Sequence, residues 1–446
     1  MEIHKKLVSA SLALCFSVLP LVAAPKTNII LIMADDIGYE CFGFAGSNQY
    51  KTPRLDQLVA EGMSFTHCYS QPLCTPSRVK LMTGLSNVRN YAAFSVLRQD
   101  QKTLGQYFQE NGYRTCIAGK WQLYGAEHYA ERFRGKGTMP EDAGFDSMCL
   151  WQVDKLGGRF WNPLLYVDGE NKQFGATEYG PDIATKHITD FIEDNRNKPF
   201  FVYYPMILTH NPFVPTPASE NRMSKDKQKN FEDMTAYMDT LIGRIVDKTR
   251  EVGIAENTLI LFVGDNGTNV AIRSRLNGVA IRGGKGKMTD AGTRVPFVAY
   301  QPGSVDAGQI NSNLIDFSDF LPTTLEAVGV VPPQNIDGQS FLWQLRGKTG
   351  EPRKWIHIFY HPRPEKGMAL AFVRTQRYKL YRDGRFYDVL NDVKEESSLG
   401  TSGLSRQAID AKTLLGEALK TMPAYGQMLL KYGKRKSLVN QDRLPK

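Results

Sequence analysis

Three long apolar runs constrain the fold of this chain more than any other feature. Residues 28–33 read Asn-Ile-Ile-Leu-Ile-Met, residues 200–204 read Phe-Phe-Val-Tyr-Tyr, and residues 258–263 read Thr-Leu-Ile-Leu-Phe-Val. Runs that are apolar throughout and rich in β-branched or aromatic residues are typical of strands buried on both faces of a mostly parallel sheet. The chain is therefore expected to build its core around such a sheet.

Oxygen-bearing side chains follow two of these runs directly. Asp35 and Asp36 come after the first run, and Asp265 and Asn266 come after the last. In open α/β sheets, ligands bind at the carboxyl ends of the strands. Carboxylates brought together there require a cation or raised pKa values, and a set without Cys or His favours Ca²⁺ or Mg²⁺ over Zn²⁺. Acidic pairs after strands are also common in turns and helix caps, so both interpretations stay open at this point.

The alternation of strand and helix patterns predicts an α/β fold. Helical patterns lie between the apolar runs, at 53–61, 104–109, 182–193 and 231–251. Strands alternating with helices predict a large, mostly parallel central sheet flanked by helices on both faces. We expect this N-terminal α/β domain to span residues 25–350.

The remaining residues, 351–446, are expected to form a smaller C-terminal subdomain. Short alternating segments occur at 355–360, 370–374, 378–381 and 385–388, and a helical pattern follows over 405–422. Period-2 alternation is typical of half-buried strands, so the sequence predicts a small antiparallel sheet covered by a helix.

The first residues have the layout of a secretory signal peptide. A short basic start precedes an apolar run over residues 7–21, and small residues follow up to residue 24. The run is somewhat short for a hydrocarbon core of about 30 Å, so we expect no integral membrane association. A signal peptide over residues 1–24 predicts export to the periplasm or the extracellular space; an uncleaved N-terminal anchor is the alternative.

Composition narrows the class of protein without identifying it. Lys and Arg number 55 against 46 Asp and Glu, and the net charge of +9 favours anionic partners in general. We expect no nucleic-acid partner. Six cysteines in 446 residues are too few for a disulfide scaffold. Five of them lie beyond residue 24, and the four other than Cys74 leave up to two disulfides open.

The most specific motif lies at residues 74–78, which read Cys-Thr-Pro-Ser-Arg and are followed by Thr83-Gly84. This segment resembles the signature of the type I, formylglycine-dependent sulfatases of the alkaline phosphatase-like superfamily. Other motifs of that family occur in the same order and extend the resemblance over roughly residues 27–400. They are Asn28–Gly38, Gly119–Trp121, Thr209-His210, Val263–Gly267, Arg282–Gly286, Asp319–Thr324, Ile336–Ser340, Arg374–Lys379 and Tyr387-Asp388.

The resemblance implies that a maturation enzyme oxidises Cys74 to Cα-formylglycine, which serves as the nucleophile. A sulfate ester is an anion whose sulfur is shielded, and attack by a thiol would give an intermediate without an easy exit. A hydrated aldehyde attacks with one hydroxyl and expels sulfate with the other. The resemblance also implies that residue 74 binds Ca²⁺ (Mg²⁺ is the less favoured ion) together with Asp35, Asp36, Asp265 and Asn266, so that the cation acidifies the hydrate.

Four further residues match family positions that handle the sulfate group. By resemblance, Arg78 orients the hydrate, Lys120 and Lys285 grip the sulfate, and His210 lies near the leaving oxygen. Such preorganised positive charge is usually the largest catalytic contribution. The resemblance implies a sulfatase, and the habit of the family together with the expected export favours a sulfated carbohydrate as the substrate.

One residue departs from the family pattern in a way that affects the chemistry. Residues 119–122 read Gly-Lys-Trp-Gln, where the family usually has His after Trp. Gln122 can form hydrogen bonds but is not a base near neutral pH. Another group, with His128 as a candidate, takes that role, or sulfate release is slow, or activity is lost. His361 could also reach the pocket, although packing is the favoured interpretation, and Asp290 replaces a common Glu as a structural variation.

Two other functions remain open from the sequence. A phosphomonoester or phosphonate-ester hydrolase of the same superfold would handle a tetrahedral group of similar shape and different charge. A catalytically silent glycan-binding relative would fit the change at Gln122. Cys74 with its trailing Pro-Ser-Arg favours sulfate, and the retained nucleophile and acidic residues favour an active enzyme.

Overall fold

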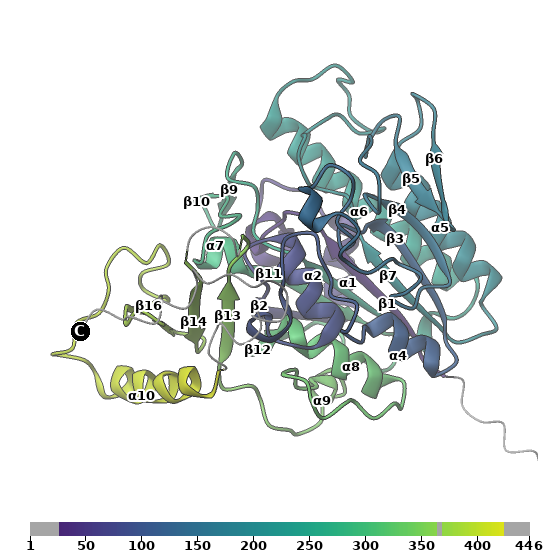
Figure 1. Cartoon of the computed structure of the whole chain (residues 1–446). Coiled ribbons are helices and arrows are strands. Elements are labelled where there is room, and N and C mark those ends of the chain that lie inside the picture. The colour runs from purple at the N-terminus through teal and green to yellow at the C-terminus, as the bar shows by residue number, and fades with distance from the viewer. Residues whose placement is uncertain (1–25, 364–367, 423–446) are drawn as a thin grey trace, which may run out of the picture.

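A ten-stranded sheet forms the centre of the computed structural model, which describes residues 26–363 and 368–422 (Figure 1). The strand order is β12-β2-β11-β8-β1-β7-β3-β4-β5-β6. The strands span β1 (Asn28–Ala34), β2 (Met63–Tyr69), β3 (Arg114–Lys120), β4 (Ser147–Trp151), β5 (Leu164–Val167), β6 (Glu170–Gln173), β7 (Phe200–Pro205), β8 (Thr258–Gly264), β11 (Arg294–Tyr300) and β12 (Gln309–Asp316).

The three apolar runs form neighbouring parallel strands in the middle of this sheet. Strand β1 pairs in parallel with β7 on one side and β8 on the other, and β3 and β4 continue the parallel order beyond β7. Antiparallel pairs occur only towards the flanks of this sheet, at β11 on one side and at β5 and β6 on the other. The prediction of a large, mostly parallel sheet is confirmed.

Side chains of β1 alternate between two hydrophobic cores, one on each face of the sheet. Ile30 and Ile32 pack with α1 (Pro53–Ala60), α5 (Gly180–Asp194) and α6 (Lys227–Glu251). Leu31 and Met33 pack on the other face with the second set of helices. That set comprises α2 (Cys74–Thr83), α4 (Leu104–Glu110), α8 (Phe320–Ala327) and α9 (Leu342–Leu345). Each fully buried aliphatic side chain contributes about 1.5–3 kcal/mol, so the two cores fix β1 at the centre of the fold.

The helices that the sequence predicted are all present, with small shifts at their ends, whereas α8 was not predicted. Helix α6 begins four residues earlier than its apolar pattern because the Asp226 carboxylate caps it, accepting from the backbone N–H groups of Gln228 and Lys229. Short elements complete the α/β region: α3 (Asn87–Asn90), α7 (Asp290–Thr293), a hairpin of β9 (Arg273–Leu276) and β10 (Val279–Arg282), and 3₁₀ turns η1 (Tyr39–Cys41), η2 (Gly43–Ala45), η3 (Glu131–Phe133), η4 (Ala255–Asn257) and η5 (Phe317–Asp319).

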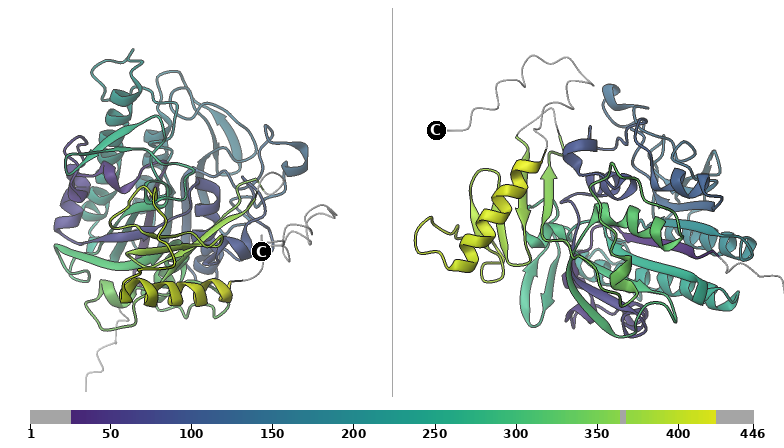
Figure 2. Two further views of the ribbon diagram at one scale, coloured as in Figure 1. Left: turned by 90° about the vertical axis from the view of Figure 1, so that its left-hand side faces the viewer. Right: turned by 90° about the horizontal axis from the view of Figure 1, so that it is seen from below.

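A four-stranded antiparallel sheet follows near the C-terminus, as predicted. Its strands lie in sequence order: β13 (Ile356–Tyr360), β14 (Leu370–Arg374), β15 (Tyr378–Tyr381) and β16 (Phe386–Asp388). Helix α10 (Arg406–Thr421) covers one face, and the whole unit packs beside the β12 end of the large sheet (Figure 2). The division of the chain at residue 350 stays a prediction.

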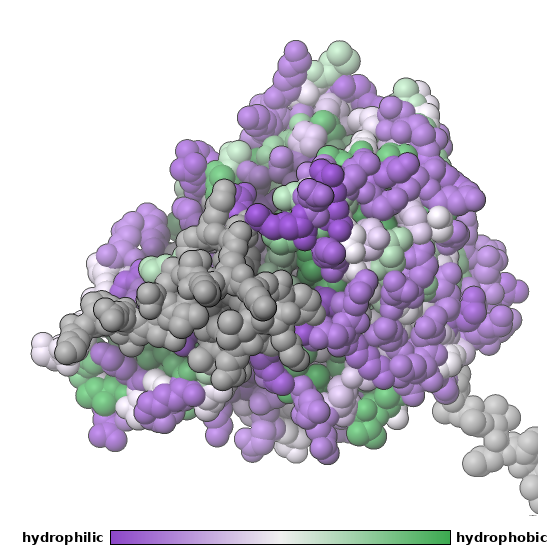
Figure 3. Space-filling view, in the orientation of Figure 1, coloured by the Kyte–Doolittle hydropathy of each residue, from purple (hydrophilic) through white to green (hydrophobic). Residues whose placement is uncertain are grey.

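The structure covers only part of the chain on which the expectations about a signal peptide and about membrane association rest. The signal peptide over residues 1–24 lies outside the described residues. Within the described ranges, none of the helices combines the length and apolarity that crossing a bilayer requires. The face drawn in Figure 3 is mostly hydrophilic, with hydrophobic residues scattered among polar ones.

All five cysteines in the described part of the chain are buried and free: Cys41, Cys68, Cys74, Cys116 and Cys149. The disulfides that the sequence left open are therefore not formed between them. Stability rests on the hydrophobic cores and on buried polar contacts.

Buried charges join the C-terminal sheet to the large one. Arg374, on β14, pairs with Asp290 of α7, and its guanidinium stacks over the ring of Tyr69 at 4.1 Å. Lys379, on β15, donates to the backbone oxygen of Met288 and to the Glu395 carboxylate. Since these groups are almost fully buried, the pair is expensive to break. The replacement of the common Glu by Asp290 is thus structural, as the sequence suggested.

We predict that Asp290→Ala lowers the free energy of unfolding by about 3–5 kcal/mol, because it leaves the Arg374 charge buried without its partner. Burial alone would raise the pKa of Asp290, but Arg374 and Lys379 outweigh burial and lower it. The stabilisation is therefore complete above the unfolded aspartate pKa of about 4 and is lost as the pH falls through the lower folded pKa. Urea unfolding at neutral and acidic pH measures both effects.

The exposed Arg406–Asp410 ion pair of α10 provides the control. Its Nε and Oδ1 atoms lie 3.1 Å apart, but both side chains are exposed to solvent. Asp410→Ala is expected to change stability by no more than about 0.5 kcal/mol. Equal losses from the two variants would contradict the assignment of Asp290 as a buried link between the sheets.

Candidate active site

The register of two central strands brings the predicted acidic residues together. Ala34 at the end of β1 lies opposite Gly264 at the end of β8, so Asp35 and Asp265 leave the sheet at the same edge. The backbone N–H of Asp36 donates to the Asp265 carboxylate at 2.9 Å. Asp36 adopts a φ of 60°, which turns the chain sharply at this point.

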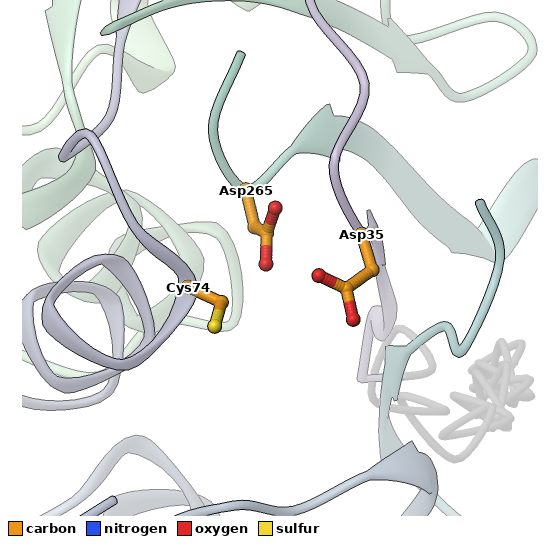
Figure 4. A group of neighbouring side chains, drawn as sticks. All are labelled: Asp35, Cys74 and Asp265. Carbon is orange, nitrogen blue, oxygen red and sulfur yellow. The ribbon is translucent and has the colours of Figure 1, made fainter. Parts of the chain in front are cut away.

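Cys74 faces this acidic edge from the first turn of α2. Its sulfur and single carboxylate oxygens of Asp35 and Asp265 all lie within 4.8 Å of one another, and the three side chains point towards a common centre (Figure 4). The turn before α2 is fixed by Ser77, whose hydroxyl accepts from the Gln71 N–H at 3.0 Å. Cys74 is only 1% exposed, so its side chain is shielded from bulk water.

The electrostatics of this edge fit a hard divalent cation. Burial and the adjacent Asp35 carboxylate raise the pKa of Asp265 well above its usual range, which reflects the cost of crowding buried negative charge. The Oδ1 atoms of Asp35 and Asn266 are buried without a hydrogen-bond partner. Buried acceptors are normally satisfied, and oxygen atoms of this kind are the ligands that Ca²⁺ prefers. The residues present therefore fit a cation such as Ca²⁺.

Cationic side chains surround the carboxylates. Lys120 donates to Asp35 at 2.7 Å, and Lys285 donates to Asp36 at 2.5 Å. Burial alone would raise the pKa of Asp35, but Lys120 and the other cationic groups lower it far below its ordinary range. Arg78 donates to the backbone oxygen of Lys120 at 2.7 Å and approaches Asp265 at 3.4 Å. The sequence-predicted residues of opposite charge thus meet in one buried cluster.

Lys120 reaches the cluster because a glycine precedes it. Gly119 has a φ of 118°, and a Cβ atom there would lie 2.0 Å from the backbone oxygen of Pro205 on β7. Only glycine permits this close approach of β3 to β7. The motif residue Gly119 is therefore a structural requirement of the site.

His210 lies beside Lys285 at the rim of the cluster. Its Nε2 is 3.1 Å from the Lys285 ammonium and 3.6 Å from an Asp36 oxygen. Burial, with the nearby lysines, lowers the pKa of His210 to about 4, although Asp36 opposes the shift. The imidazole is therefore neutral at pH 7.

Gln122, which stands where the family usually has His, contacts residue 74 directly. Its amide oxygen accepts a hydrogen bond from the Cys74 thiol at 3.1 Å, and its amide nitrogen donates to the Tyr129 hydroxyl at 3.3 Å. Gln152 donates to the same hydroxyl at 2.9 Å. His128 lies 3.3 Å from the Gln152 amide. His128 thus meets Cys74 only through this chain of side chains, and a direct role as its base is not favoured.

Two residues near the cluster were not indicated by the sequence. Arg159, between β4 and β5, lies 2.8 Å from Nδ1 of His210. Tyr360, at the end of β13, is half-buried; burial raises the pKa of its hydroxyl to about 12, with Cys74 and Lys285 among its electrostatic neighbours. His361, the next residue, is 4% exposed. The C-terminal sheet therefore reaches the site through Tyr360, and a site role for His361 stays a prediction.

The fold and the cluster indicate an enzyme that handles an anionic group beside buried carboxylates, and comparison with known proteins identifies its family. The family profile described as Sulfatase matches residues 27–330, and one described as N-sulphoglucosamine sulphohydrolase, C-terminal, matches residues 284–407. The chain belongs to the sulfatase family of the alkaline phosphatase-like superfamily and is a sulfuric ester hydrolase.

Individual relatives agree with this assignment. The N-acetylgalactosamine-6-sulfatase of Mus musculus is 28% identical over 408 residues, covering 83% of this chain and 75% of the relative. Arylsulfatase A of Bos taurus is 30% identical over 389 residues, covering 81% and 76%. Among solved structures, Ps i-CgsB matches with a TM-score of 0.72 at 26% identity, covering 88% of this chain and 92% of that one. The resemblance seen in the sequence is confirmed at the level of the family.

We predict that Asp265→Ala weakens Ca²⁺ binding at least a hundredfold, as a rough estimate, because affinity in oxygen-ligand sites follows the number of charged ligands. Calorimetric titration of the purified protein with Ca²⁺ measures the change. Asp239→Asn is the matched control, since Asp239 is a buried carboxyl whose two oxygens already accept from the backbone N–H groups of Arg54 and Leu55 at 2.9 and 2.8 Å. Undiminished Ca²⁺ affinity in Asp265→Ala would show that this carboxylate is not a ligand.

Proposed function

We propose that this protein removes a sulfate ester from a sulfated carbohydrate, with residue 74 as a formylglycine nucleophile beside a bound Ca²⁺ ion. The observation that carries the proposal is the convergence of the Cys74 sulfur with carboxylate oxygens of Asp35 and Asp265 within 4.8 Å. Lys120 and Lys285 supply positive charge at the same point. A nucleophile, a cation site and anion-binding groups are the parts that sulfate transfer requires.

Four residues would hold the cation together with residue 74: Asp35, Asp36, Asp265 and Asn266. When bound, Ca²⁺ would polarise a sulfate oxygen and acidify a hydroxyl at residue 74. Mg²⁺ demands a tighter octahedral shell and is the less favoured ion.

An unmodified thiol is poorly suited to act as the nucleophile here. Burial raises the pKa of Cys74, although Lys120 opposes the shift, so the thiol stays protonated near neutral pH. The thiolate is the reactive form of cysteine. A hydroxyl on a converted residue 74 would donate to the amide oxygen of Gln122 as the thiol does at 3.1 Å. These facts support conversion by a formylglycine-generating maturation enzyme.

The chain's own cationic residues would bind and orient the sulfate group. We assign the Lys120 and Lys285 ammonium groups to the sulfate oxygens, and Arg78 to the positioning of residue 74 and of the Lys120 backbone. His210 is neutral, and its Nδ1 lies 2.7 Å from the Asn211 carbonyl oxygen, which favours a proton on Nδ1 and leaves Nε2 to accept from Lys285 at 3.1 Å. Lys285 would then supply the proton that the leaving oxygen needs, with His210 beside it.

The carbohydrate substrate and the location rest on independent support. A curated relative is named for removing sulfate from N-acetylgalactosamine, which supports a sulfated sugar as the substrate. The layout of residues 1–24 supports export to the periplasm or the extracellular space.

The proposal is tested with protein from a host that contains the maturation enzyme. We expect peptide mass spectrometry to find an aldehyde at residue 74 and to find a thiol at Cys149, which is equally buried but lies outside the motif. Cys74→Ala is expected to lower sulfate release from sulfated saccharides about a thousandfold or more, because loss of a nucleophile has effects of this order. Cys149→Ala is expected to remain active.

Two results would contradict the proposal. An intact thiol at residue 74 in active protein would exclude the formylglycine. Faster hydrolysis of 4-nitrophenyl phosphate than of 4-nitrophenyl sulfate would favour the phosphoester hydrolase instead.

Gln122 generates a separate prediction about rate. Because an amide cannot take a proton near neutral pH, Gln122→His should place a base beside residue 74 and raise kcat by about tenfold, a modest part of the gain that a positioned base provides. The added rate should fall as the pH drops below the imidazole pKa of about 6.5. Rate measurements from pH 5 to 9 check both, and Gln122→Asn, which keeps an amide, controls for altered packing. An unchanged rate and pH profile would show that another group already acts as the base.

A further inference from the structure

Arg159 is held rigidly at the outer side of the sulfate-handling residues. It lies in the segment between β4 and β5, and its guanidinium stacks on the indole of Trp151, 3.9 Å from the ring centre. A terminal nitrogen lies 2.8 Å from Nδ1 of His210. Stacking on one face and contact along one edge fix the direction in which the remaining N–H groups point.

The Arg159 charge has no carboxylate partner in the described ranges, where no Asp or Glu oxygen comes within ion-pair distance of it. Arg78, by contrast, approaches both Asp35 and Asp265. Burial lowers the pKa of Arg159, and the more distant Asp35 and Asp36 compensate only in part. A partly buried cation without a partner is costly, so this position favours an anion supplied from outside the chain.

The position of Arg159 separates it from the sulfate-binding residues. His210 presents Nε2 to Lys285 and Asp36, and presents the opposite nitrogen, Nδ1, to Arg159. Arg159 and Lys285 therefore contact opposite nitrogens of the same imidazole ring. This displaces Arg159 from Lys285, so that it can contact a part of the substrate other than the sulfate that Lys285 binds.

The charge balance of the site also favours a second anionic group on the substrate. Three cationic side chains, Arg78, Lys120 and Lys285, contact the carboxylates of Asp35, Asp36 and Asp265, and Arg159 adds a fourth cation beside His210. One positive charge is in excess, and a bound Ca²⁺ would add two more. A sulfate monoester carries a single negative charge, so a substrate with a second anionic group matches the site better than a neutral sugar with one sulfate.

We propose that Arg159 binds a second anionic group of the substrate, a carboxylate or another sulfate on the same saccharide. This inference rests on the proposed function and names the substrate class as polyanionic saccharides. A planar guanidinium pairs with carboxylate and sulfate oxygens through two parallel hydrogen bonds.

The test compares matched saccharides that differ in one anionic group. Sulfate release is first measured for three kinds of sulfated mono- or disaccharide. The first kind carries a single sulfate and no other anionic group, the second also carries a uronic acid, and the third also carries a second sulfate. For the substrates that the wild-type protein cleaves, Arg159→Gln is expected to raise KM about ten- to a hundredfold for members with the second anion. KM for the singly sulfated member should change less than about threefold. If the rise in KM is larger for the uronic acid substrates, the group that Arg159 binds is a carboxylate; if it is larger for the disulfated substrates, that group is a sulfate.

Two variants separate this role from a structural one. Arg159→Lys keeps the positive charge but loses the paired N–H donors of the guanidinium. It should therefore show part of the affinity that Arg159→Gln loses. Arg222→Gln is the matched control, because Arg222 also stacks on an indole, that of Trp161 at 4.4 Å, but is exposed. It should leave KM unchanged for all substrates.

Three outcomes would overturn the inference. Equal losses of Arg159→Gln on singly and doubly charged substrates, or a fall in kcat with unchanged KM, would show that Arg159 only positions His210. A wild-type preference for the singly sulfated member would also exclude it. Release of sulfate from none of the saccharides would instead overturn the proposed function, on which the inference depends.

Discussion

The crowding of three carboxylates at one buried edge of the sheet is the constraint on which the rest of this structure depends. Strands β1 and β8 run in parallel and in register, so their ends cannot separate Asp35 from Asp265. Like charges at this spacing and burial are unfavourable unless cations compensate them. Lys120, Lys285 and Arg78 supply part of this compensation, and the unpaired oxygens of Asp35 and Asn266 leave room for a further cation. The chemistry proposed for the site follows from the same arrangement, because cationic groups that offset buried negative charge can also bind an anionic substrate.

Much of the fold could be predicted because the central strands carry a strong pattern. The runs that form β1, β7 and β8 are apolar throughout, since both faces of these strands are covered. Other strands of the same sheet lack such a pattern. Strand β11 contains Pro296, where its register with β2 shifts, and the first half of β12 is polar and partly exposed. These segments are strands because the sheet offers them a partner, and only tertiary structure reveals that.

The candidate site divides in the same way. Residues inside short motifs, such as Cys74 and Asp265, were recognisable because a strand end or a helix start fixes them locally. Arg159 is 51 residues from His210 in the chain, and no periodicity links them. Tyr360 reaches the site only because the C-terminal sheet packs beside the large one. Similarly, the role of Gln122 as an acceptor from Cys74 became visible only once the contact was located in space. When a side chain reaches the site from a long loop or from a second sheet, no local sequence pattern shows that it lies there.

The near-complete burial of Cys74 has a consequence for the biogenesis of the protein. Every residue of α2 is buried, and Cys74 is 1% exposed, so the active site of another protein could not close around this part of the backbone after the core has formed. A protein catalyst that converted Cys74, as the proposed function requires, would therefore have to act before α2 docks against the sheet. Conversion would then compete with folding, and a chain that folded first would keep its thiol.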